Sequence, residues 1–142
     1  MLRTLTRTAQ FAAAALLVLA CTACGPQSGP PATTAQDQRQ EVVDIVMKAD
    51  PSASNIHASN RVSGLSRGWS IEIDHEGEVT PELLESILVP VAALDSNPVD
   101  ITLYFFEPGT DEAIDIAPAA DQLGVPWTPV GSGGSWLAGQ VE

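Results

Sequence analysis

The chain has 142 residues, and its 18 acidic residues against 6 Lys or Arg give a formal net charge of −12. That length allows one domain, because two full hydrophobic cores need a longer chain. Hydrophobic residues make up 44% of the sequence, which argues against a wholly disordered chain. The acidic balance excludes a protein that reads nucleic acid through a basic surface.

Residues 1–20 have the pattern of a secretory signal peptide. Arg3 and Arg7 give a positive start without acidic residues, and an apolar run follows at residues 11–20. This run is about half of the roughly 20 apolar residues that a membrane-spanning helix needs. The alternative, a buried helix of the domain, would need a polar face that the run lacks.

The two cysteines, Cys21 and Cys24, follow the apolar run directly. The sequence VLAC at residues 18–21 resembles the lipobox of bacterial lipoproteins, with Cys21 as the lipidated residue. Cys24 is the alternative, although a cysteine then stands where an aliphatic residue is usual. The resemblance implies cleavage before the cysteine, a diacylglyceryl anchor in the cell membrane and an extracytoplasmic domain. The resemblance does not indicate any particular enzymatic activity.

The composition predicts three further segments. Residues 21–36 are rich in Pro, Gly, Ser, Thr and Gln, which indicates a flexible tether. Residues 37–126 carry the periodic patterns of a compact domain. Residues 127–142 include the sequence GSGGS, and we expect a flexible tail there.

Two helices are predicted. Residues 37–50 carry a helical apolar stripe, with Asp37 and Gln40 as a capping box and Pro51 after the end. A second helix begins at Thr80 as N-cap, and Pro90 should kink or end it.

Strands are predicted by alternation of apolar and polar residues. They cover residues 55–63, 69–75 and 99–107, followed by a short returning strand at 113–117 and one helical turn at 119–124. The order α-β-β-α-β-β predicts an α+β two-layer sandwich, with a four-stranded mixed, mostly antiparallel sheet and both helices on one face.

Residues 64–68 match G-x-S-x-G, the motif that places a nucleophilic serine on a strand-to-helix turn in hydrolases. Here a strand follows Ser66, and His75 is the only histidine after it. A glycine-bracketed hairpin loop is therefore favoured over a small serine hydrolase. His57 and His75 are 18 residues apart, which is not the short spacing typical of a zinc site.

Two groups of acidic residues lie in predicted turns: Asp74, Glu76 and Glu78, and Glu107, Asp111 and Glu112. Carboxylates on loops can bind Ca²⁺ weakly, but the usual calcium-loop pattern is absent. Solvated loops are the favoured interpretation, and a weak divalent-cation site is the alternative.

The strand at 99–107 places Thr102, Tyr104 and Phe106 on the sheet face opposite the helices. Two aromatic residues there make an apolar patch, which either the C-terminal segment covers through Trp127 or a partner occupies. Trp136, in the Gly-rich segment, is the better candidate for a partner contact, or it makes no contact at all.

The sequence thus favours a lipid-anchored extracytoplasmic binding protein of the cell envelope over an enzyme. We expect no catalytic residue, cofactor or nucleic-acid partner, and we expect a monomeric domain. An envelope protein is the expected partner, on a face formed by Thr102, Tyr104, Phe106 and Trp127.

Overall fold

The computed structural model describes residues 33–64 and 66–141. The predicted signal peptide, both cysteines and most of the predicted tether lie outside these residues. Among the described residues, no helix has the length and apolar character needed to cross a membrane.

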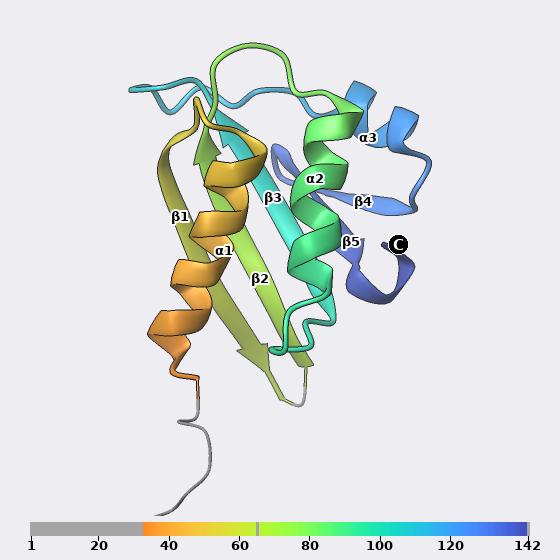
Figure 1. The fold of residues 1–142 in the computed structure, drawn as a ribbon. Helices are drawn as coiled ribbons and strands as arrows, with labels where there is room; N and C mark the ends of the chain where they lie inside the picture. The colour runs from red at the N-terminus through yellow and green to blue at the C-terminus, as the bar shows by residue number, and fades with distance from the viewer. Residues whose placement is uncertain (1–32, 65, 142) are drawn as a thin grey trace, which may run out of the picture. The chain divides into compact units, whose positions relative to one another are not determined.

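The described chain forms a mixed sheet with helices packed on one face, which confirms the α+β class (Figure 1). The strands are β1 (Ser54–Ser63), β2 (Ser66–Asp74), β3 (Asp100–Phe106), β4 (Trp127–Val130) and β5 (Gly133–Leu137). Their order across the sheet is β1-β2-β3-β5-β4, with β2 and β3 parallel and the other pairs antiparallel. The prediction of four strands was wrong, because the strand expected at residues 113–117 is not formed and the C-terminal segment supplies β4 and β5 instead.

Helix α1 (Ala35–Ala49) covers β1 and β2. Residues next to its two ends determine where the helix begins and ends. Thr34 is the N-cap, and its capping box is completed by Asp37 rather than by the predicted pair Asp37 and Gln40. At the other end, Asp50 is the C-cap and precedes Pro51, as the sequence predicts. The buried residues Val42 and Val46 face the sheet.

Helix α2 (Pro81–Ala92) is the crossover that joins the parallel strands β2 and β3. Thr80 caps it through a hydrogen bond from the backbone N–H of Leu83 to the threonine hydroxyl. The helix does not end at Pro90 but continues to Ala92. Pro90 is exposed near the C-terminal end, where few hydrogen bonds remain to be lost.

The core lies between α1, α2 and the central strands. The alternation predicted for β2 and β3 is confirmed, because one face of each strand is fully or almost fully buried: Trp69, Ile71 and Ile73 on β2, and Ile101, Leu103 and Phe105 on β3.

The C-terminal segment is not a tail. Strand β5 pairs with β3, so that Trp136 lies opposite Ile101 and is 1% exposed. The backbone N–H of Ala138, in a short 3-10 helix η1 (Ala138–Gln140), donates to the carbonyl of Val99.

The returning strand predicted at residues 113–117 is reduced to one antiparallel bridge between Phe106 and Ala113. The chain then turns into helix α3 (Ala117–Leu123), which extends the predicted helical turn at 119–124. The Asp115 carboxylate accepts a hydrogen bond from the backbone N–H of Ala117, which starts the helix early.

Candidate functional site on the open face of the sheet

The sheet face opposite α1 and α2, here called the open face, is the face on which we expect binding. The strand register places one Ser or Thr residue of every strand in a single row across the open face. This row is here called the hydroxyl band. The hydroxyl band consists of Ser59, Ser70, Thr102, Ser135 and Thr128. The open face is therefore polar at its centre, as is usual for a sheet face in contact with water.

An ion pair borders the hydroxyl band. The Arg61 guanidinium donates to Oδ2 of Asp100 over 2.5 Å and to the Thr102 hydroxyl over 3.1 Å. Gly68 lies between Arg61 and Asp100 in the sheet, and a Cβ there would come within 2.0 Å of Oδ1 of Asp100. Glycine in the middle strand therefore leaves room for the ion pair to span β2.

The predicted contact residues differ in exposure. Tyr104 and Phe106 are half-buried on the open face, whereas Thr102 is 1% exposed and donates to the Ser135 hydroxyl. Tyr104 lies over Gly133, where a Cβ would come within 2.6 Å of the ring. The two aromatic side chains are therefore available for contact, and Thr102 is a buried support beneath Arg61.

Trp127 and Trp136 lie on the other side of the sheet. They are paired in register and stacked, with ring centroids 6.1 Å apart. Because Trp136 lies opposite Ile101, whose side chain enters the core, both tryptophans point toward the helices. The prediction that Trp127 folds over Tyr104 and Phe106 was therefore wrong, and so was its placement on the same interaction face. Trp136 is 1% exposed, which contradicts a partner contact at this residue.

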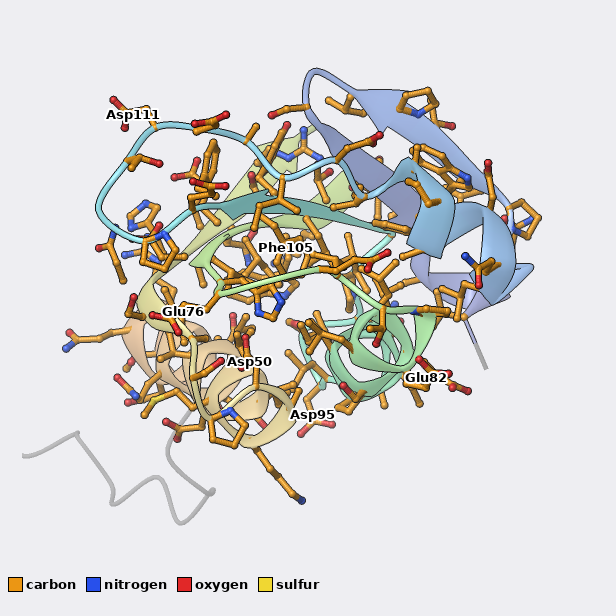
Figure 2. The ribbon with its side chains drawn as sticks, turned by 90° about the horizontal axis from the view of Figure 1, so that it is seen from above. Asp50, Glu76, Glu82, Asp95, Phe105 and Asp111 are labelled. Carbon is orange, nitrogen blue, oxygen red and sulfur yellow. The ribbon has the colours of Figure 1, made fainter. Side chains whose placement is uncertain are left out.

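Acidic residues of the two predicted turns line two different hollows. The hollow on the open face, of about 150 Å³, is lined by seven residues: Asn55, His57, Glu72, Asp74, Phe106, Thr110 and Asp111. The loop that carries Asp111 lies on the side of the sheet away from the helices (Figure 2).

The second hollow contains Glu76, Glu78 and Glu107, and Glu112 lines neither hollow. Across residues 33–64 and 66–141, no group of three or more His, Cys, Asp or Glu side chains is arranged to hold a metal ion. The alternative of a cation site therefore gains no support from the geometry.

The two histidines are held apart in different surroundings. His57 is exposed on the open face, whereas His75 is buried and its Nδ1 lies 2.6 Å from Oδ2 of Asp50. Asp50 also accepts hydrogen bonds from the backbone N–H and the hydroxyl of Ser52. Burial raises the pKa of the Asp50 carboxyl, but the hydrogen bonds from Ser52 and His75 outweigh it and hold the pKa below its ordinary value.

The Asp50–His75 pair was missed by sequence reasoning, which treated Asp50 only as the end of a helix. The pair joins the end of α1 to the end of β2, and the His75 ring meets Phe105 edge-on at 5.8 Å. No sequence spacing indicates it, because the two residues are 25 positions apart. Its position inside the protein favours a structural role.

Ser66 lies in a hairpin and not at the turn that a hydrolase requires. It pairs with Ser63 across the β1–β2 turn and is the first residue of strand β2. The strand-to-helix turn that exposes a nucleophilic serine is therefore not formed here.

No protein-family model, no curated protein and no solved structure matches this chain. Proposals about function therefore depend on the chemistry of the open face and of the sequence.

Proposed function

We propose that the protein is a lipid-anchored, extracytoplasmic binding protein that contacts a protein partner of the cell envelope through the open face. The observation that carries this proposal is the pair of half-buried aromatic residues, Tyr104 and Phe106, on a sheet face that α1 and α2 leave free (Figures 1 and 2). Aromatic residues are enriched at the centres of protein interfaces.

The surroundings of these aromatics support recognition of a protein. The hydroxyl band offers donors and acceptors next to Tyr104, and Arg61, whose side chain is 51% exposed, offers a guanidinium at the border. Aromatic side chains beside hydrogen-bonding groups and an arginine are a combination that is enriched at protein interfaces.

The proposed anchor is supported by the sequence alone. Cys21 follows the predicted signal peptide in a lipobox-like context, and a diacylglyceryl group with a further acyl chain gives stable membrane attachment. We propose Cys21 as the lipidated residue and Cys24 as the alternative.

The binding proposal is tested by substituting both aromatics, Tyr104→Ser and Phe106→Ser, in the full chain. Chemical crosslinking in intact cells, followed by purification from membranes, should recover fewer partner proteins with this variant than with the parent chain. Met47→Ser is the matched control, because Met47 is a 54% exposed apolar residue on the helix side. An unchanged set of partners in the double variant contradicts the proposal.

A further inference from the structure

The aromatic residues of the open face have carboxylates as direct neighbours. In the register between β2 and β3, Glu72 lies beside Tyr104 and Asp74 lies beside Phe106. Asp111 adds a third carboxylate from the loop that follows β3, and with Phe106, Glu72 and Asp74 it lines the hollow on the open face (Figure 2). A partner that contacts the aromatic residues therefore meets negative charge on the same surface.

The described chain places a single basic residue on the open face. Arg39 and Lys48 lie on α1, which packs on the opposite face of the sheet. Arg67 stands two residues before Trp69 on β2, so it points to the same side as that core residue. Among the residues that the structure describes, only Arg61 remains for the open face.

This arginine is bound elsewhere on the face. The Arg61 guanidinium donates to the Asp100 carboxylate and to the Thr102 hydroxyl. The other close charge contact within residues 33–64 and 66–141 joins His75 to Asp50. The three carboxylates that line the hollow therefore have no ion-pair partner in this part of the chain, whereas the Asp100 carboxylate on the same face has one.

The size and the lining of the hollow indicate what fits it. Its volume is about 150 Å³. Pockets that enclose a drug-sized ligand have roughly 300–1,000 Å³, so the hollow suits one side chain of a larger molecule better. The half-buried ring of Phe106 beside carboxylates is an environment that stabilises a guanidinium or ammonium group, through attraction to the ring and through charge-assisted hydrogen bonds.

We propose that the partner protein presents an Arg or Lys side chain from a protruding segment, and that this side chain enters the hollow between Phe106 and the carboxylates. Charge complementarity decides the occupant, because the hollow is acidic and the only described base of the open face is already paired. This inference rests on the proposed function and names the chemistry of the partner at this part of the open face.

The first step of the test is a photo-crosslinking residue in place of His57, in the full chain and in intact cells. His57 is exposed, lies opposite Glu72 on β1 and lines the hollow. We expect it to capture a segment of an envelope protein with Arg or Lys at or next to the crosslinked position. The same residue at Met47, on the helix side, should not capture this segment. No crosslink at His57, a crosslink to a second copy of the chain, or a segment without Arg or Lys overturns the inference.

The second step reverses the charges of the contact, with the purified chain and a synthetic peptide of the captured segment. Glu72→Lys should weaken peptide binding at least about tenfold, and a peptide in which Glu replaces the basic residue should bind this variant better than the parent peptide does. Rescue by the charge-reversed peptide also shows that the variant is folded.

Glu85→Lys is the matched control, because it makes the same change in net charge at an exposed residue of α2. Its effect on binding should stay below about twofold, since a distant exposed charge is screened by salt. Equal weakening by the two variants, or no rescue by the charge-reversed peptide, overturns the inference.

The outcome also separates this inference from the proposed function. If a crosslinker at Tyr104 captures an envelope protein and the segment captured at His57 lacks Arg and Lys, the open face binds the partner and the inference fails alone. If neither position captures a protein, both proposals fail.

Discussion

At the scale of single residues, the Asp50–His75 pair is the main buried polar contact between α1 and the sheet. The Asp50 side chain is 7% exposed and that of His75 10%, so each lies in surroundings where an unpaired polar group is costly. Figure 2 shows Asp50 on the helix side of the sheet, away from the loop of Asp111. This position fits a role in joining the two layers.

Asp50→Asn should lower the free energy of unfolding at pH 7 by about 2 kcal/mol, because a carboxylate acceptor for His75 and Ser52 is lost. The pKa of Asp50 lies below its ordinary value in the folded protein. Its contribution is therefore complete above about pH 4 and is lost as the pH falls through the folded pKa. Urea unfolding at pH 7 and at a series of lower pH values should show the difference in stability between the two proteins shrinking as the pH falls below about 4.

Asp44→Asn is the control for this change. Asp44 lies on the same helix but is exposed, and its carboxylate accepts a hydrogen bond from the side-chain amide of Gln40. We expect a change below about 0.5 kcal/mol at all of these pH values. A constant difference between Asp50→Asn and the parent protein at all pH values would contradict the account of the pair.

Gly133 is a second residue whose identity affects the stability of the folded protein. A Cβ at this position would come within 2.2 Å of the Leu103 carbonyl oxygen and 2.6 Å of the Tyr104 ring. Gly133→Ala should cost about 1–3 kcal/mol, because β5 must move away from β3. Gly139→Ala is the control, since a Cβ there meets nothing within 4 Å. Thermal unfolding of both variants measures the difference, and equal melting temperatures would refute it.

At the scale of elements, the sequence predicts the central strands well and the C-terminal hairpin poorly. Trp69, Ile71 and Ile73 alternate with polar residues, and strands with one buried face keep this pattern. In β5 the alternation of apolar and polar residues cannot be recognised, because Gly133 and Gly134 are residues typical of a loop. The structure supplies the reason for these glycines: a Cβ at Gly134 would meet both Trp127 and Trp136.

The candidate site could likewise be predicted only in part. Alternation places Tyr104 and Phe106 on the open face, and the register confirms that placement. The hydroxyl band and the Arg61–Asp100 ion pair depend on which strands are neighbours in the sheet. No local sequence pattern predicts this strand order. The inward direction of Trp127 depends on the same pairing, so the sequence could not supply it.

The C-terminal hairpin should be necessary for stability. Trp136→Ala should lower the free energy of unfolding by about 3–5 kcal/mol, because it empties a fully buried site beside Ile101. Leu137→Ala, one residue further on and 52% exposed, should cost less than about 0.5 kcal/mol. Denaturant unfolding compares the two, and a small effect of Trp136→Ala would mean that β5 is dispensable.

At the scale of the whole molecule, charge is distributed unevenly along the described chain. Its Lys and Arg residues lie on α1, β1 and β2, and the chain from Gly68 to Glu142 has 14 acidic residues and no Lys or Arg. An acidic surface is repelled by anionic lipid headgroups. The proposed membrane contact is therefore the acyl chains alone, with the folded domain held away from the lipid.

The proposed anchor predicts a clear effect on location. Cys21→Ser should release the protein from the membrane fraction, because no acyl chain can then be attached at that residue. Cys24→Ser should leave the protein in the membrane, and mass spectrometry of the mature N-terminus should show acylated Cys21. Membrane retention of Cys21→Ser together with release of Cys24→Ser would identify Cys24 as the lipidated residue. Retention of both variants would contradict the proposed anchor.

The central claim is that the open face binds a protein partner, and site-specific photo-crosslinking in intact cells tests it most directly. A crosslinking residue at Tyr104 should capture an envelope protein, and the same residue at Met47, on the helix side, should not. Phe106→Ser should reduce the yield from Tyr104, because the two aromatics share one face. No captured protein at Tyr104, or equal capture at Tyr104 and Met47, would contradict the claim.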